Sequence, residues 1–208
     1  MPTVLAVRHG ETEWNRIGRM QGWAPVALND RGRRQARAVA PELATRWDVD
    51  RVVASDLERT AETAALLAEA GPLPEPTHDA AFRERDVGRF QGLPKGPLRT
   101  GDGGRPDLPD LSAVEYAPDG GESLRAMATR VRDGFDRLAR AADESETVLL
   151  VTHGGPIRAL LGAAHDQSLA TALSVHDPDN CSVTVFEADA GVPTAARRAD
   201  LPTPSGAD

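Results

Sequence analysis

Two distant stretches of this chain share one pattern, in which a short apolar run ends at a histidine followed by glycine. The first is "TVLAVRHG" at residues 3–10, and the second is "TVLLVTHGG" at residues 147–155. Their β-branched and aliphatic residues predict two buried strands. Open parallel sheets carry their crevices outside the carboxyl ends of the strands. The pattern therefore predicts one sheet that brings both histidines to a shared crevice.

Strand and helix signals alternate between these two stretches. "RVVAS" at 51–55 is a further β-branched run, and "RRQARAVAPELATRW" at 33–47 has helical spacing. Pro41 lies inside this helix and should bend or split it, because proline lacks a backbone donor. Ser55 and Glu58 have the spacing of a capping box, which predicts the start of the next helix.

The second half of the chain continues the alternation. The helix that starts after residue 55 should stop at Gly71, and residues 122–142 carry apolar side chains at intervals of three and four. Pro156 is expected at the first position of the helix after the second histidine. Residues 180–201 predict two final strands around a turn. These elements predict an α/β fold, a three-layer α/β/α sandwich with a mostly parallel central sheet.

The length and composition predict one domain. A chain of 208 residues with 40% hydrophobic content can bury one full core, and we assign it to residues 1–200. The Gly- and Pro-rich stretch at 92–121 is expected to form a lid loop, and residues 201–208 a disordered tail. The apolar runs are too short to span a membrane and no signal pattern opens the chain, so we expect a cytoplasmic protein.

Charge and cysteine content restrict the partners. A formal net charge of −8 argues against nucleic acid, whose binding depends on cations that neutralise phosphates. An anionic ligand would have to meet a local cluster of arginines. The single cysteine, Cys181, excludes an internal disulfide and a cysteine-based zinc cluster. The oligomeric state is left open.

Three further residues complete a chemical set with His9 and His153. Arg8 precedes the first histidine, and Glu84 lies in "FRERDVGRFQG". Arg59 is predicted in the first turn of a helix, where free backbone amides favour anions. A single histidine at a strand end is more often a satisfied surface group, but two at equivalent positions favour a shared site.

Six ordered motifs now carry a family resemblance over most of the chain. They are "RHGETEWN", "LNDRGRRQA", "SDLERTAETA", "RERDVGRFQG", "GGES" and "VTHGGPIRALL". In this order and spacing they resemble the histidine phosphatase superfamily, the phosphoglycerate mutase-like proteins. One departure is "WAPVALND" after Gly22, which lacks the Asp and Pro-Leu often found there in the family and leaves the neighbouring substrate contacts uncertain.

The resemblance implies a role for each candidate residue. His9 is expected to be the nucleophile that takes the phosphoryl group, with Arg8, Arg59 and His153 around the phosphoryl oxygens. Glu84 is expected to give a proton to the leaving oxygen. The implied phosphate or substrate contacts are Thr12, Asn15, Gln21, Gly22 and Gly154.

Physical chemistry supports these roles independently. A phosphomonoester carries about −1.5 to −2 charges near neutral pH, which favours a neutral imidazole over an anionic attacker. Flanking arginines would keep His9 neutral and would stabilise the charge on the equatorial oxygens, so no metal or other cofactor is expected. An alkoxide leaves poorly, and a proton from Glu84 would contribute roughly 10²–10⁴-fold.

Other phosphatase chemistries fit the residues less well. Six positions after Cys181 stands Glu187, where a cysteine phosphatase loop needs arginine. "WDVDR" has the aspartate spacing of aspartyl-phosphate enzymes, but no apolar strand precedes it. "HDPDNC" at 176–181 is more typical of a polar turn than of a metal site, and no "GKS" or "GKT" phosphate loop occurs. The tryptophans are interpreted as packing residues, with Trp14 a possible wall of the pocket.

Three functions follow from the sequence: a phosphatase acting on a small phosphorylated metabolite, a mutase-type phosphoryl transferase, and a non-catalytic phosphate-binding protein. Phosphoglycerate mutases that the chain resembles carry a long helical insertion after the position of Glu84. Here the Gly- and Pro-rich loop at 92–121 stands instead, which favours the phosphatase. The loop offers Lys95, Arg99, Arg105 and Tyr116 for recognition, but the substrate itself is not determined.

Overall fold

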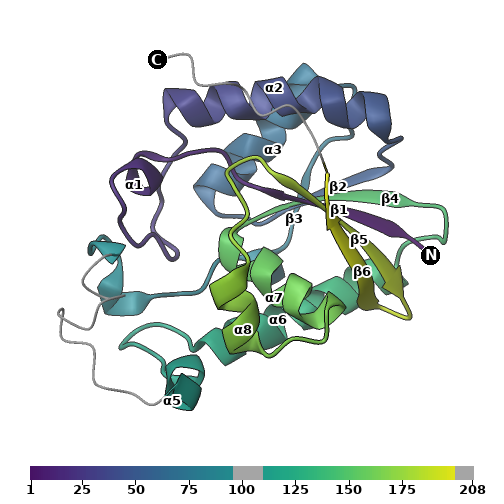
Figure 1. Ribbon diagram of the computed structural model, residues 1–208. Helices are drawn as coiled ribbons and strands as arrows, with labels where there is room; N and C mark the ends of the chain where they lie inside the picture. Colours follow the sequence, from purple (N-terminus) through teal and green to yellow (C-terminus); the bar gives the residue numbers. More distant parts are fainter. Residues whose placement is uncertain (96–109, 200–208) are drawn as a thin grey trace.

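A central six-stranded sheet organises the protein, and the computed structural model describes residues 1–95 and 110–199 (Figure 1). The strand order is β3-β2-β4-β1-β5-β6. The first four strands in this order are parallel, and β5 and β6 run antiparallel to their neighbours. The predicted mostly parallel sheet is therefore confirmed. The strands are β1 (Thr3–Arg8), β2 (Arg51–Ala54), β3 (Thr77–His78), β4 (Thr147–Thr152), β5 (Val183–Asp189) and β6 (Val192–Arg198).

Helices cover both faces of this sheet, as expected for a three-layer α/β/α sandwich. Helices α2 (Asp30–Arg46) and α3 (Glu58–Ala70) lie on one face, and α6 (Leu124–Arg140), α7 (Gly154–Ala164) and α8 (Leu169–Val175) lie on the other (Figure 1). The shorter elements are α1 (Glu13–Arg16), the 3-10 turns η1 (Ala80–Phe82) and η2 (Gly88–Phe90), and α5 (Asp110–Glu115).

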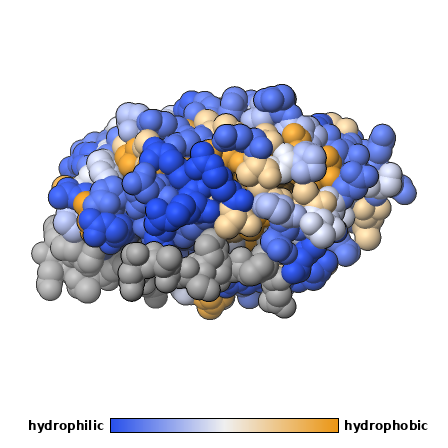
Figure 2. Space-filling view, turned by 90° about the horizontal axis from the view of Figure 1, so that it is seen from above, coloured by the Kyte–Doolittle hydropathy of each residue, from blue (hydrophilic) through white to orange (hydrophobic). Residues whose placement is uncertain are grey.

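The core has two parts because strand side chains alternate between the faces. In β1, Val4 and Ala6 belong to the cluster that includes the apolar face of α6. Leu5 and Val7 belong to the cluster packed against α2 and α3. The outer surface of the α2 layer is largely hydrophilic, with small separate hydrophobic patches (Figure 2). The amphipathic helices thus bury their apolar faces against a sheet that is apolar on both sides.

Three local predictions are corrected by the structure. Helix α2 runs through Pro41 without splitting; the proline is exposed while Ala40 and Leu43 pack in the core. Helix α3 has Leu57 as its N-cap residue and no side-chain cap, so the predicted capping box at Ser55 is wrong. Helix α7 begins at Gly154 rather than at Pro156. Pro156 is still in the first turn, where its missing N–H removes no helical bond.

The predicted lid loop at 92–121 is only partly within the described residues. Its end contains a helix, α5, where no element was expected, and Lys95 at its start donates its backbone N–H to the carbonyl of Gly18 at 2.8 Å. Arg99, Arg105 and the predicted disordered tail at 201–208 lie outside the described part of the chain. None of the helices in the described ranges is long and apolar enough to cross a membrane.

Candidate active site

The two histidines lie side by side at the carboxyl ends of neighbouring strands. Strands β1 and β4 are parallel and adjacent, with Arg8 in register with Thr152, so that each strand is followed directly by its histidine. The imidazole rings of His9 and His153 are 5.2 Å apart between centroids, at an angle of 62°. Both side chains are buried. The two histidines therefore lie together at one edge of the sheet, as expected from the sequence.

The orientation of the His9 ring identifies its free nitrogen. Nδ1 lies 2.7 Å from the carbonyl oxygen of Gly10. A carbonyl can only accept, so Nδ1 carries the hydrogen and Nε2 keeps its lone pair. Gly10 cannot be replaced without strain here, because a Cβ would approach the Gly32 carbonyl oxygen to 2.6 Å. The close packing of the turn thus fixes an imidazole with an available nucleophilic nitrogen.

His153 is held by a residue that the sequence analysis assigned elsewhere. Its Nε2 lies 2.9 Å from the hydroxyl oxygen of Ser55, which directly follows β2. Nδ1 of the same ring is buried and has no hydrogen-bond partner among the described residues. Ser55 does not cap α3 because its hydroxyl instead serves His153 and, at 3.4 Å, the N–H of Leu57.

Arg59 is buried without a carboxylate. Only 1% of the residue is exposed, and Nη2 and Nη1 donate to the carbonyl oxygens of Gly22 at 2.8 Å and Ala24 at 3.3 Å. Burial, opposed by Glu84 and assisted by the positive charge of Arg8, lowers the pKa of the guanidinium to about 10. The side chain remains charged at neutral pH and keeps a buried Nε without a partner in the described chain.

Arg8 contributes a second cation to the crevice. Its Nη1 donates to the carbonyl oxygen of Pro178 at 2.6 Å, and its Nε is buried with no partner among the described residues. Within residues 1–95 and 110–199, neither Arg8 nor Arg59 forms an ion pair. The buried Arg59 and the half-buried Arg8, which have no carboxylate partner among the described residues, favour the entry of an anion into the site.

The two histidines are neutral at physiological pH. The pKa of His9 is well below its ordinary value of 6.5, first because the ring is buried and then because Arg59 and Arg8 repel a positive charge. The pKa of His153 is likewise well below 6.5, from burial, Arg59 and the neighbouring His9. Both rings therefore present lone pairs and N–H groups rather than positive charge.

Glu84 reaches the same region from the segment between η1 and η2. Oε1 accepts the N–H of Arg85 at 2.8 Å, and Oε2 accepts the N–H of Gly155 at 3.1 Å. A Cβ on Gly155 would collide with the Glu84 carboxylate. The glycine that follows Gly154 thus allows the carboxyl group to lie against the start of α7.

The residues predicted to contact the phosphate or the substrate lie in different local environments. Thr12 and Asn15 form a reciprocal capping box at the start of α1, with the Thr12 hydroxyl accepting the Asn15 N–H at 3.1 Å. Gln21 is buried, and its Oε1 has no partner among the described residues. Gly22 has φ +52° and gives its carbonyl to Arg59. Gly154 begins α7, and a Cβ there would lie 3.8 Å from Arg8 Nε.

Sequence reasoning missed the turn that supports the end of β1. Asn180 Nδ2 donates to the carbonyl oxygen of His9 at 2.8 Å, and the N–H of Cys181 donates to the carbonyl oxygen of Arg8 at 2.9 Å. "HDPDNC" is a polar turn before β5, as predicted, but its position beside β1 was not foreseen. Burial raises the pKa of the Cys181 thiol to about 12, which leaves it protonated and unsuited to nucleophilic attack.

The described part of the chain contains no group of three or more His, Cys, Asp or Glu side chains arranged to hold a metal ion. The predicted site residues provide two cations, N–H donors and the carboxyl group of Glu84, which lies close enough to Arg8 and Arg59 to oppose the lowering of their pKa values. Such a set can bind a tetrahedral oxyanion, stabilise charge on its oxygens and move one proton.

Comparisons with known proteins agree with this chemistry. Residues 4–201 match the model of the histidine phosphatase superfamily (branch 1). The chain is 35% identical over 187 residues to phosphoglycerate mutase-like protein 4 of Arabidopsis thaliana, covering 88% of this chain and 78% of that protein. It is 36% identical over 159 residues to the metal-independent phosphoserine phosphatase of Arabidopsis thaliana, covering 76% and 66%. The structure of a mycobacterial glucosyl-3-phosphoglycerate phosphatase in complex with VO3 superposes with a TM-score of 0.78 at 31% identity, covering 98% and 99% of the two chains.

Proposed function

Because the chain belongs to the histidine phosphatase superfamily, in which it is a phosphoric monoester hydrolase, we propose that it acts through a phosphohistidine on His9 and without a metal ion. The proposed substrate is a small phosphorylated metabolite. The net charge of −8 disfavours nucleic acids and anionic membrane surfaces as partners, and we expect the protein to act in the cytoplasm.

One observation carries the proposal: a neutral imidazole with a free Nε2 lies near the buried Arg59 and the half-buried Arg8, neither of which forms an ion pair among the described residues. The phosphoryl oxygens would accept hydrogen bonds from Arg8 and Arg59, whose Nε groups have no partner there. His153 and the amide of Gly154, which begins a helix, would supply further contacts. An anion would thus satisfy donors that have no partner within residues 1–95 and 110–199.

The proposed reaction has two steps. His9 Nε2 attacks phosphorus as the bond to the ester oxygen breaks, and Glu84 gives that oxygen its proton, so that an alcohol leaves. Water then attacks the phosphohistidine, Glu84 takes back a proton from the water, and inorganic phosphate is released. Arg8 and Arg59 would stabilise the charge on the equatorial oxygens in both steps.

The proposed substrate class rests on the small phosphate esters for which two relatives are named and on the positive charges of Arg8 and Arg59. One relative is named for phosphoserine and another for glucosyl-3-phosphoglycerate, both small phosphate esters. The word metal-independent in one of these names supports the proposal that the arginines replace a metal ion here. Mutase-type phosphoryl transfer is the alternative outcome of the following experiment.

Purified protein is incubated with a panel of phosphorylated metabolites, and free phosphate is measured. Rapid quenching should trap an acid-labile phosphoenzyme on His9, located by peptide mass spectrometry, and absent from His9→Ala. A parallel incubation with 3-phosphoglycerate measures phosphate and 2-phosphoglycerate together. Rapid isomerisation with negligible phosphate release would replace the hydrolase by a mutase, and phosphate release without a phosphohistidine would overturn the mechanism.

A further inference from the structure

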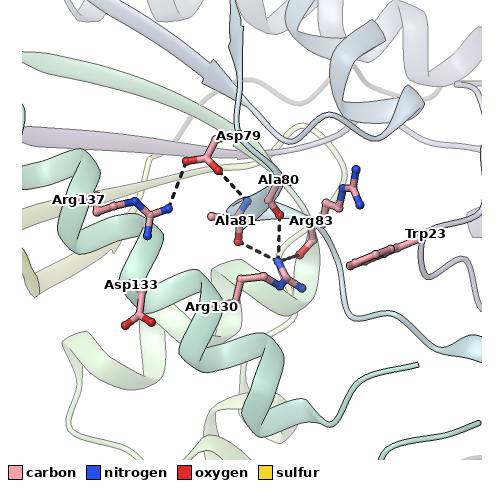
Figure 3. Close-up of a pocket in the computed structure, with 8 residues that line it drawn as sticks. All are labelled: Trp23, Asp79, Ala80, Ala81, Arg83, Arg130, Asp133 and Arg137. Atoms are coloured by element: carbon pink, nitrogen blue, oxygen red, sulfur yellow. Dashed lines mark hydrogen bonds and ion pairs between the residues drawn. The ribbon is translucent and has the colours of Figure 1, made fainter. Parts of the chain in front are cut away.

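A cavity of about 430 Å³ borders the segment that leads to Glu84 (Figure 3). Residues 79–81 and Arg83 form one side, α6 forms another, and Trp23 closes the end. Its three arginines are each paired with a carboxylate: Arg83 with Asp56, Arg130 with Glu122, and Arg137 with Asp79. These pairs neutralise the cations, so the cavity is poorly suited to an anion. Among its side chains, Trp23 and Arg130 instead donate hydrogen bonds to the neighbouring backbone.

Arg130, on α6, binds the backbone of the segment 80–84. Its Nη1 donates to the carbonyl oxygens of Ala80 at 3.3 Å, Ala81 at 2.9 Å and Arg83 at 3.1 Å (Figure 3). Its Nη2 donates to the carbonyl oxygen of Glu84 at 3.3 Å. One side chain therefore binds four carbonyls in a row of five residues. The same guanidinium also pairs with Glu122, whose Oε1 accepts the N–H of Asp86 at 3.1 Å.

Trp23, which lies far earlier in the chain, also binds the backbone carbonyl of Glu84. Its indole Nε1–H donates to the Glu84 carbonyl oxygen at 2.7 Å. The guanidinium carbon of Arg83 lies 4.5 Å from the centroid of its ring, and that of Arg130 lies 5.9 Å away. Two cations thus lie near the indole ring, and its N–H donates to the backbone of Glu84.

The residues on either side of Trp23 connect these contacts with the Glu84 backbone to Arg59. Gly22 and Ala24, on either side of the tryptophan, give their carbonyls to the Arg59 guanidinium. The tripeptide 22–24 therefore holds a buried cation with two of its carbonyls and the backbone of Glu84 with its central side chain. A displacement of Trp23 would move the proposed proton donor relative to the proposed phosphoryl site.

We propose that Trp23 and Arg130 are positioning residues that fix the Glu84 carboxyl group for proton transfer, an inference that rests on the proposed function. Neither side chain touches the substrate. Misplacement of a catalytic group by about 1 Å can cost on the order of 10²-fold in rate. Because the residues act through Glu84, their loss slows reactions that need a proton at the leaving oxygen more than reactions that do not.

The test uses the dependence of rate on the leaving group. Trp23→Phe keeps an aromatic ring but removes the N–H together with the rest of the pyrrole ring, and Arg130→Lys keeps the charge but removes the planar set of guanidinium donors. Each variant should lose about 10-fold or more in kcat/KM on an alkyl phosphate and less than about 3-fold on p-nitrophenyl phosphate, whose leaving group needs no proton. Trp47→Phe and Arg137→Lys are the matched controls, expected to lose equally little on both substrates.

Rates measured in the Glu84→Gln variant distinguish a positioning role of Trp23 from a general contribution to the stability of the fold. There Trp23→Phe should add less than about 2-fold, because the group that it positions no longer donates a proton. A full additional loss in that background, or equal losses on the two substrates, would overturn the inference. Circular dichroism and thermal unfolding are recorded for every variant. If one variant fails to fold, the other decides; if both fail, the contacts serve stability and the inference is rejected.

The outcomes also distinguish this inference from its premise. A wild-type protein that releases no phosphate from any ester contradicts the proposed function. A Glu84→Gln variant with equal losses on both substrates contradicts the role of Glu84. A Glu84→Gln variant that shows the leaving-group effect, combined with Trp23 and Arg130 variants that do not, contradicts only the positioning role.

Discussion

The imidazole rings of His9 and His153 meet edge to face, with 5.2 Å between their centroids, although the two residues lie in opposite halves of the chain. Burial and the charges of Arg59 and Arg8 keep the pKa values of both rings well below 6.5. The site therefore combines two neutral imidazoles with one buried and one half-buried arginine, and this positive charge favours an anionic ligand. The following predictions depend on that balance.

His9→Ala should abolish turnover while preserving the fold. Without the Nε2 nucleophile, kcat/KM should fall by at least about 10³-fold, because no other nucleophile can form the covalent intermediate. Steady-state kinetics and circular dichroism measure the two effects. Phosphate binding, measured by calorimetry, should survive because Arg8 and Arg59 remain. A variant with more than a tenth of the wild-type rate would show that His9 is not the nucleophile.

Glu84→Gln should slow alkyl phosphates far more than aryl phosphates. Loss of the proton donor should reduce kcat by about 10²–10⁴-fold for an alkyl ester. An activated aryl phosphate leaves without a proton and should lose much less. The measurement is kcat for a series of esters whose leaving groups differ in pKa. A slope that is the same in wild type and variant would remove Glu84 from the role of general acid.

Inorganic phosphate should stabilise the wild-type protein through Arg59. A ligand at 100 times its Kd raises the free energy of unfolding by about 2.7 kcal/mol when it binds only the folded state. Arg59→Met should remove most of this increase, because the buried guanidinium is one of the donors proposed for the anion. Thermal unfolding with and without phosphate gives the comparison. Arg137→Met, an exposed arginine on α6, is the control and should respond to phosphate like the wild type.

Activity should persist in excess chelator. The positive charge that a divalent ion supplies in other phosphatases comes here from Arg8 and Arg59 in our proposal. Initial rates are measured after dialysis against EDTA and again after addition of magnesium or zinc. Equal rates are expected throughout. An enzyme that loses its activity on chelation and regains it with either ion would contradict metal independence.

The free energy of unfolding should decrease as the pH falls below 6.5. Burial, Arg59 and Arg8 lower the pKa of His9 and His153 in the folded chain, whereas the unfolded chain protonates both near 6.5. Below that pH the unfolded state binds more protons, so each histidine removes up to about 1.4 kcal/mol per pH unit. Urea unfolding from pH 8 to 5 measures the slope. A His9→Gln, His153→Gln double variant should have a shallower slope, and an unchanged slope would contradict the assignment.

The strand that carries each histidine was predictable because its signal is local. Apolar, β-branched residues at 3–8 and 147–152 form β1 and β4 as expected, and parallel pairing then places His9 beside His153. The amphipathic spacing at 122–142 likewise predicted α6, whose apolar face fills the core. These apolar patterns predict which side chains are buried, and both the sheet and its helices bury their apolar faces in the core.

The contacts of polar side chains were predictable only in part, because a hydroxyl or guanidinium can satisfy local or distant partners. Ser55 had the spacing of a helix cap, yet in the structure its hydroxyl serves His153. Thr12 and Asn15, which we predict to contact the ligand, also form the capping box of α1, a local pairing that was not foreseen. The same rule that located His9, a polar residue just after a parallel strand, also applies to Ser55 and would have identified it.

The sequence by itself determined the layered α/β fold and the two strand ends at which His9 and His153 lie, since the hydrophobic periodicity that defines each strand and helix is set by residues close together in the chain. Only the tertiary structure decided which distant groups complete the site. It placed the Asn180 amide on the carbonyl of His9, the Ser55 hydroxyl on His153, and the Trp23 indole and Arg130 guanidinium on the backbone of Glu84. Such contacts join residues far apart in sequence, and their energies depend on orientations that exist only after the core has packed.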